Sequence, residues 1–275
     1  MKVLWAGTGS AFAPAGLWQC QAVIESNTGK RLLVDCGATA PYSLAQYANM
    51  SAFDVDGVYI SHLHGDHVHG LEWLAFNRYP WGGVSRAPKP KLYGISTVLT
   101  KLWAHVLRGT LESIEGHVNT FADYFDLHPI EPNESFTWEG IQFDPVQTVH
   151  VMNGRALTDS FGILVTSEEG YKVFFTTDTQ FCPSQIKVFY EQADLIFHDC
   201  GTAAFKSGVH AHYTDLVTLP DVVKAKIGLI HYLDGPSGKF YDEEKAKADG
   251  FIGFIRPGYT LSTQDITDVE ARLRC

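Results

Sequence analysis

The residues best suited to chemistry in this chain lie in one short window, SHLHGDHVHG, at positions 61–70. The window holds five side chains of this kind: His62, His64, Asp66, His67 and His69. Imidazole nitrogens and carboxylate oxygens are donors that Zn²⁺ and related divalent ions accept in proteins. So dense a group predicts a metal site rather than a solvated surface.

The position of this window after an apolar run supports the same interpretation. GVYIS reads as a buried strand, so His62 and His64 follow its end and point to the same side of the chain. Asp66 and His67 come next, while His69 is expected to start a helix and orient the cluster without binding metal. One pair can serve one ion and the second pair another, because two ions about 3.5–4 Å apart can hold both oxygens of a hydrolysis.

Two metal sites need further ligands, and three residues at the ends of strand-like runs qualify. His150 ends FDPVQTVH, Asp178 ends YKVFFTTD and His231 ends AKIGLIH. Taken alone, each has an ordinary structural explanation, as a hydrogen-bonded core histidine or as an aspartate in a cap or turn. The histidine window changes this balance, because an incomplete metal cluster would leave several imidazoles crowded without a partner.

Composition limits the classes of function. The chain has 275 residues, 45% of them hydrophobic and 19% charged, as in a compact folded protein. The net charge of −10 argues against stable nucleic-acid binding through a basic surface. The first residues alternate like a strand instead of forming a signal peptide, and no window has the roughly 20 apolar residues of a membrane span. Five scattered cysteines indicate reduced thiols, so a cytoplasmic protein is expected.

The elements that must position these residues alternate between strands and helices. Nine apolar runs read as strands: KVLWAG, CQAVIES, RLLVDCG, GVYISH, KLYG, SFGILVTS, KVFFTTD, LIFHDCG and IGLIHY. SNTGKR and SEEGYK read as hairpin turns, and helices are expected over 98–108 and after Thr263. We expect an α/β fold in a single domain over residues 1–275 with its functional residues at strand ends.

SHLHGDH resembles the metal motif of the metallo-β-lactamase superfamily, and the later His, Asp and His keep its order. LWAGTGSAF and RLLVDCG resemble the start of its ribonuclease Z-like branch. The resemblance implies an αββα sandwich of two mixed sheets flanked by helices. It also implies two divalent metal ions, Zn²⁺ first with Mn²⁺ or Fe²⁺ as alternatives. One ion would be bound by His62, His64 and His150, the other by Asp66, His67 and His231, with Asp178 bridging.

A proton donor for the leaving group follows from the same resemblance. FHDCGTA is similar to the segment that carries an acidic residue in ribonuclease Z relatives, which implies a catalytic role for Asp199. His210 matches the histidine that assists there, and His212 is its rival. His198 is as well explained by a structural role.

Two features bear on the substrate. Only VMNGRALTDS separates His150 from the next strand, so the basic arm with which ribonuclease Z holds tRNA is missing. The Pro/Gly-rich segment 77–91 is expected to be a surface loop that binds nucleotide phosphates and bases. Its candidate substrate-binding residues are Arg78, Tyr79, Trp81 and Arg86. The alternative is a solvated loop whose aromatic side chains pack locally or against a second subunit.

HVMNGRALTDSFGI, FFTTDTQF and GVHAHYTDLVTLP are similar to the anti-Pycsar cyclic nucleotide phosphodiesterases of phages and bacteria. This resemblance implies a homodimer that hydrolyses 3',5'-cyclic nucleotides such as cCMP, cUMP, cAMP and cGMP, in evasion of antiviral signalling. Two alternatives remain open at this point. One is a ribonuclease Z-like endoribonuclease, and the other is a protein that sequesters a nucleotide without hydrolysing it.

Overall fold

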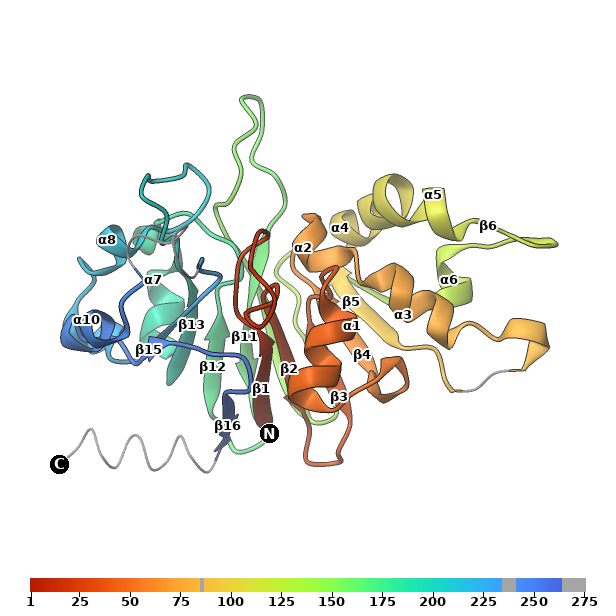
Figure 1. Cartoon of the computed structure of the whole chain (residues 1–275), viewed down its shortest axis with the longest axis horizontal. Coiled ribbons are helices and arrows are strands. Elements are labelled where there is room, and N and C mark those ends of the chain that lie inside the picture. The colour runs from red at the N-terminus through yellow and green to blue at the C-terminus, as the bar shows by residue number, and fades with distance from the viewer. Residues whose placement is uncertain (85–86, 234–240, 264–275) are drawn as a thin grey trace.

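The computed structural model describes residues 1–84, 87–233 and 241–263. Two seven-stranded sheets form its centre (Figure 1). The first has the order β16 (Thr260–Ser262), β1 (Lys2–Gly7), β2 (Gln21–Glu25), β3 (Arg31–Val34), β4 (Gly57–Ile60), β5 (Lys91–Ile95), β8 (Asp126–Ile130). The second has the order β15 (Gly253–Phe254), β14 (Ile227–Ile230), β13 (Leu195–Asp199), β12 (Lys172–Phe175), β11 (Phe161–Thr166), β10 (Ile141–Gln147), β9 (Phe136–Trp138).

The two sheets repeat one pattern of strand pairing. In the first, pairing is antiparallel from β16 to β3 and parallel from β3 to β8. In the second, it is antiparallel from β9 to β12 and parallel from β12 to β15. All nine predicted strands are present, and both predicted hairpin turns are confirmed, with Gly29 and Gly170 at φ of 81° and 90°.

Helical segments cover the outer faces of the sheets (Figure 1). Those before β9 are α1 (Ala40–Ser43), η1 (Leu44–Ala48), η2 (Ala52–Asp54), α2 (Gly65–Val68), α3 (Leu71–Arg78), η3 (Trp81–Gly83), α4 (Ser96–Lys101), η4 (Leu102–Leu107), α5 (Arg108–Leu111) and α6 (Phe121–Tyr124). Those after β12 are α7 (Pro183–Gln192), α8 (Tyr213–Leu216), α9 (Asp221–Lys224) and α10 (Glu243–Ala248). A small hairpin pairs β6 (Ser113–Ile114) with β7 (His117–Val118). The metallo-β-lactamase arrangement, α/β with two mixed sheets between helices, is therefore present as predicted.

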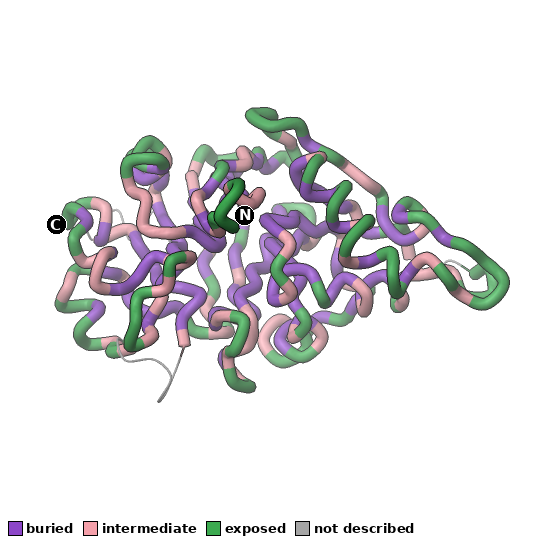
Figure 2. Tube along the Cα trace, turned by 90° about the horizontal axis from the view of Figure 1, so that it is seen from above, coloured by how far each residue is buried: buried purple, intermediate pink, exposed green. Residues whose placement is uncertain are grey.

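Aromatic side chains join the inner faces of the sheets. Trp5 of β1 packs against Phe175 and Phe197 of the second sheet, with ring centroids 5.8 and 5.0 Å apart. At the other end, Phe136 of β9 stacks on Tyr93 of β5 at 4.3 Å. Buried residues follow the strands, and the outer helix faces are exposed (Figure 2). Because aromatic residues bury large apolar areas, this interface holds the two sheets in a fixed relation.

The three helix predictions have different outcomes. The helix expected over 98–108 is confirmed and spans α4, the π-helical η4 and α5, with Trp103 and Val106 half-buried. His69 does not start a helix, because it caps the end of α2 and the next helix, α3, begins at Leu71. The helix predicted after Thr263 lies outside the described residues. No helix among the residues described has the length and apolar character to cross a membrane.

Candidate metal centre

The predicted ligands come together at one edge of the sheets. Residues that follow the carboxyl ends of parallel strands meet at the same sheet edge, where open α/β sheets place their sites. His62 and His64 follow β4, Asp178 follows β12, and His231 follows β14. Asp66 and His67 lie in α2 beside them, and His150 comes after the antiparallel strand β10. The structure thus draws ligands from the connections of both sheets to one place.

The backbone turns sharply at the ends of three strands beside the cluster, β3, β12 and β14. Asp35 after β3, Thr177 after β12 and His231 after β14 have φ of 65°, 49° and 59°. L residues rarely take this left-handed conformation, which costs roughly 1–3 kcal/mol and persists mainly where surrounding structure imposes it. The turns at Thr177 and His231 direct the side chains of Asp178 and His231 into the cluster. The strained backbone thus positions two of the predicted ligands.

Asp178 lies at the centre of the cluster. Its Oδ2 lies 3.7 Å from His62 Nε2 and 3.6 Å from His150 Nε2. Its Oδ1 lies 3.3 Å from His67 Nε2 and 3.4 Å from His231 Nε2. Each carboxylate oxygen therefore faces its own pair of imidazoles, which is the arrangement that a carboxylate bridging two cations requires.

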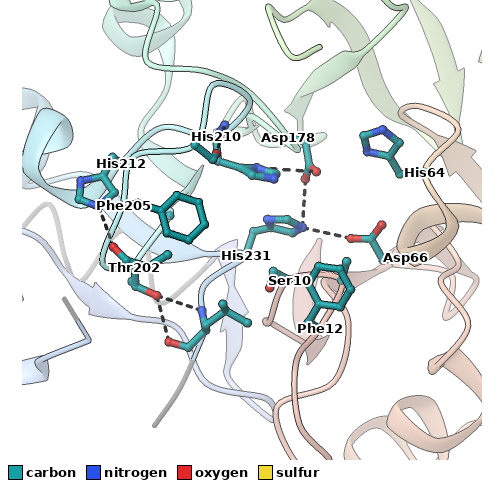
Figure 3. Close-up of a pocket in the computed structure, with 15 residues that line it drawn as sticks. Ser10, Phe12, His64, Asp66, Asp178, Thr202, Phe205, His210, His212 and His231 are labelled. Carbon is teal, nitrogen blue, oxygen red and sulfur yellow. Dashed lines mark hydrogen bonds and ion pairs between the residues drawn. The ribbon is translucent and has the colours of Figure 1, made fainter. Parts of the chain in front are cut away.

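The ligand atoms form two compact groups around Asp178. In each group the candidate donor atoms lie within 4.8 Å of one another. The first group consists of His62, His64, His150 and Asp178, and the second of Asp66, His67, Asp178 and His231. These are the two sets that the resemblance implied. All members except the exposed His64 are buried, and Figure 3 shows His64, Asp66, Asp178 and His231 converging.

The outer ring nitrogens of the histidines are held by acceptors of the protein. His67 Nδ1 donates to the Asp35 carboxylate at 2.7 Å, and His150 Nδ1 donates to the Val209 carbonyl at 2.7 Å. Asp35 was not among the predicted site residues, although its position directly after the strand in RLLVDCG could have indicated a role at the site. Its carboxylate also accepts hydrogen bonds from the Ser61 amide and hydroxyl. Such partners fix the tautomer of a metal-binding histidine, so Nε2 is left free to bind.

Several inner atoms of the cluster have no hydrogen-bond partner among the described residues. His62 Nε2, His67 Nε2 and Asp178 Oδ1 are buried and unpartnered. Unpaired buried polar atoms cost free energy, so several in one place indicate a group that binds them. Nitrogen and carboxylate donors suit Zn²⁺, Mn²⁺ or Fe²⁺. The residues present therefore fit divalent metal ions.

The pKa shifts in the cluster differ from one ligand to the next. Burial lowers the pKa of His62 well below its ordinary value, and the neighbouring His67 lowers it further, so the ring is neutral and has a free electron pair. Burial also lowers the pKa of His150. For Asp178, burial would raise the pKa, but the imidazoles of His231 and His67 outweigh it and keep the pKa well below its usual range. Burial would also lower the pKa of His67 and of His231, but the Asp178 carboxylate and its neighbours outweigh this and raise both pKa values well above the ordinary value. Neutral imidazole and ionised carboxylate are the forms that bind metal, so metal binding would release the protons of these two rings.

Three histidines outside the two groups, His198, His210 and His212, differ in what they contact. His210 Nδ1 donates to Asp199 Oδ2 at 2.8 Å, and this ring borders the metal cluster (Figure 3). His212 instead caps the start of α8 and contacts the Ala203 carbonyl at 3.0 Å. Buried His198 hydrogen-bonds with the Tyr190 hydroxyl at 2.6 Å, inside the core beneath α7. The geometry therefore favours His210 over His212 as the group that faces substrate.

Three of the residues predicted to bind substrate in segment 77–91, Arg78, Tyr79 and Trp81, are not brought to this site. Arg78 is buried at the end of α3, and its guanidinium donates to the carbonyls of Ala52, Phe53, Val55 and Pro88. This corrects the expectation that Arg78 binds phosphate, because its donors are already used inside the protein. Tyr79 and Trp81 pack on each other at 4.9 Å, and Arg86 lies outside the described residues.

A cavity of about 210 Å³ opens beside the cluster (Figure 3). Its inner wall includes His64, Asp66, Asp178, His210 and His231. Its outer wall includes Phe12 and Phe205, two residues that were not among the predicted substrate-binding residues.

The chain is similar in sequence to proteins of one family. Its residues 1–261 match the family described as anti-Pycsar protein Apyc1. The chain is 33% identical to an anti-Pycsar protein Apyc1 of Paenibacillus xerothermodurans, covering 91% of this chain and 98% of the relative. It is 30% identical to one of Bacillus phage vB_BveM-Goe7, covering 85% and 89%.

The solved structures that resemble it share its fold. The metallo-β-lactamase fold protein YhfI of Bacillus subtilis superposes with a TM-score of 0.70 at 20% identity, covering 94% of this chain and 98% of that one. The short form of human tRNase Z does so with a TM-score of 0.65 at 17% identity, covering 95% and 99%. The fold is thus that of the metallo-β-lactamase superfamily. The chain belongs to the anti-Pycsar protein Apyc1 family.

Proposed function

We propose that this chain is a metal-dependent phosphodiesterase that hydrolyses 3',5'-cyclic nucleotides to nucleoside monophosphates. The observation that carries the proposal is the Asp178 carboxylate, whose two oxygens each face a pair of imidazoles at the wall of a small cavity. Membership of the anti-Pycsar family supports it, as does the resemblance to cyclic nucleotide phosphodiesterases. The function in the cell would be the removal of a cyclic-nucleotide antiviral signal.

Seven residues would hold two divalent ions, with Zn²⁺ as the first choice. One ion would take the group containing His62, His64 and His150, the other that containing Asp66, His67 and His231, and Asp178 would contact both. Bound there, the ions supply Lewis acidity that activates water and offsets charge on the phosphoryl oxygens. The protein therefore needs no nucleophilic side chain of its own.

The cavity suits a substrate whose negative charge is met by cations rather than by the protein. None of its fifteen lining residues, all in the described part of the chain, is lysine or arginine. Asp66, Asp178 and nearby Asp199 make the metal-free site acidic. A phosphate group would be repelled there until the ions are bound, since like charges at short range disfavour binding.

His210 and Asp199 form the pair that protonates the leaving ribose oxygen. Burial lowers the pKa of His210, but the charge of Asp199 and its hydrogen bond outweigh this, so the pKa lies above its ordinary value. Because Nδ1 donates to Asp199, the opposite nitrogen Nε2 is the one available to substrate. A protonated imidazole beside a departing alkoxide is the arrangement that general acid catalysis needs.

The assay of this function uses purified protein loaded with Zn²⁺ and a panel of cAMP, cGMP, cCMP and cUMP. We expect linear monophosphates as products, with turnover abolished by a chelator and restored by added metal. Asp178→Asn should lose activity, whereas Asp221→Asn, which changes a side chain that is 95% exposed, should keep it. Failure of the loaded protein to turn over any of the four nucleotides would contradict the proposal.

Two alternatives are separated by the same products. Binding of a cyclic nucleotide that is recovered intact would indicate sequestration. Faster cleavage of precursor tRNA would indicate a ribonuclease Z-like enzyme, although the position of its tRNA-binding arm holds only a short hairpin with a Met152–Leu157 bridge here. We also propose that the protein acts as a cytoplasmic homodimer, which light scattering of the purified protein would test.

A further inference from the structure

The two most exposed aromatic side chains among the described residues lie at the same cavity. Phe12 is 88% exposed and Phe205 is 71% exposed. Both line the cavity beside the metal cluster (Figure 3). Single exposed apolar residues are ordinary, but two phenylalanines on one binding cavity indicate a ligand that covers them.

The two rings come from loops on different sheets. Phe12 lies between β1 and β2, in a turn closed by the hydrogen bond from Ala13 N to Ser10 O at 3.0 Å. The base of this loop is tied to the end of β14, because Ser10 N donates to the Tyr232 carbonyl at 3.2 Å. The attachment holds the Phe12 loop against the second sheet, although its strands belong to the first.

The loop that carries Phe205 is also fixed at its base. The Gly201 amide donates to the Ala211 carbonyl at 2.7 Å, which closes the segment after β13. Lys206 forms an ion pair with Asp215 at 2.5 Å, next to the exposed ring. Both rings are thus offered to the cavity from anchored loops, so little ordering is needed when a ligand binds.

The chemistry of the cavity separates its two ends. The inner end has the carboxylates and imidazoles of the cluster, where a phosphate would lie once metal is bound. The outer end has the two phenyl faces. A ligand anionic at one end and flat and aromatic at the other matches both, and a nucleotide has that form. Stacking on phenyl rings accepts any base, because every base has a π face.

We propose that Phe12 and Phe205 form a base-binding subsite that stacks on the nucleobase while the phosphodiester lies at the metal cluster. This assignment rests on the proposed function and adds to it the residues that bind the part of the substrate remote from the reacting bond. It replaces segment 77–91 as the place where the base is held.

The test compares Phe12→Ala, Phe205→Ala and the double variant with the wild type, all loaded with Zn²⁺. Each substitution should raise KM for cAMP roughly 5- to 150-fold, the range of one base–aromatic stacking contact. The kcat should change little, since a contact equal in ground and transition state affects KM alone. Phe205→Tyr, which keeps a ring, should restore most of the affinity. Phe53→Ala, which removes an exposed ring outside the cavity, should have no effect.

A second substrate shows whether the rings act on the base. A cyclic ribose phosphate with a methoxy group in place of the base should be hydrolysed equally by the wild type and the variants. Equal losses of activity on this substrate and on cAMP would overturn the proposed base-binding role. An unchanged KM for cAMP in the variants would overturn it as well. If the wild type itself hydrolyses no cyclic nucleotide, it is the proposed function that fails, and this result is distinct from the others.

Discussion

At the scale of single residues, the site depends on contacts that aim each imidazole. His67 is an example, because Asp35 accepts from its Nδ1 while Nε2 faces Asp66 and Asp178. Asp35 also holds Ser61 through two hydrogen bonds of 2.8 Å, so one buried carboxylate joins the end of β3 to the chain that carries the first ligands. Its role would be positional, since it contacts the proposed ligand His67 and belongs to neither group of residues that would hold the ions.

Asp35→Asn should weaken metal binding and activity roughly 10- to 100-fold, the usual effect of removing a partner of a metal-binding histidine. The amide can no longer accept from both Ser61 and His67 with the same two oxygens. Zinc affinity by competition with a chelating dye, together with kcat, measures the effect. Asp221→Asn is the matched control. Unchanged affinity in Asp35→Asn would contradict the role given to this carboxylate.

His210→Ala should lower kcat for cAMP by roughly 10²- to 10⁴-fold, the usual contribution of a general acid. The loss should be small for bis(p-nitrophenyl) phosphate, because p-nitrophenolate leaves without a proton. His212→Ala, which removes a helix cap, should not discriminate between these two substrates. Equal losses on both substrates in His210→Ala would show that this histidine has another role.

At the scale of elements, strand ends position the site and the helices support it. Arg78 shows this for α3, because its buried guanidinium binds four backbone carbonyls around η2 and Pro88. We expect Arg78→Met to destabilise the fold by at least about 2 kcal/mol, since buried acceptors lose their donors. KM of the folded fraction should not change. Arg108→Met, which changes a 57% exposed side chain that forms an ion pair with Glu112, is the control for chemical denaturation.

A higher KM in Arg78→Met with unchanged stability would restore the earlier expectation that Arg78 binds substrate. That expectation failed for a physical reason. Sequence shows that arginines and aromatic residues are near one another, but not the direction in which a helix end points. The same limit applies to His210 and His212, which are two positions apart and equally suited by type, yet only His210 meets Asp199.

The strands could be predicted where burial makes them continuous and apolar. β4 and β14 are buried at every position, and both were recognised. The strands that went unrecognised lie mainly at the edges of the sheets, such as β8, with Pro129 and exposed positions, and the two-residue β15. Edge strands lack one neighbour, so their sequences carry a weaker apolar signal.

At the scale of the whole molecule, the site joins two similarly paired sheets. The first four predicted ligands follow β4 of one sheet, and the last three follow β10, β12 and β14 of the other. Such ions would therefore crosslink two halves that otherwise meet through the aromatic interface. The repeated pairing pattern could not be seen in the sequence, because it lies in strand direction and not in residue identity.

Removal of metal should lower the stability of the entire chain. An ion present at about 1,000 times its Kd adds about 4 kcal/mol per site, and 1 kcal/mol corresponds to roughly 2–4 °C in Tm for a domain of similar size. We expect chelation to lower Tm by roughly 10 °C or more, reversibly on addition of Zn²⁺. Scanning calorimetry of Asp178→Asn, which should respond less, provides the comparison. A Tm that does not change when chelator is added would show that the two sheets are held together without metal.

The most direct measurement is anomalous diffraction from crystals grown with Zn²⁺, collected on both sides of the zinc edge. The account predicts two peaks about 3.5–4 Å apart, one between His62, His64 and His150 and the other between Asp66, His67 and His231, with Asp178 between them. No peak at this cluster, or one ion bound without Asp178, would contradict the account.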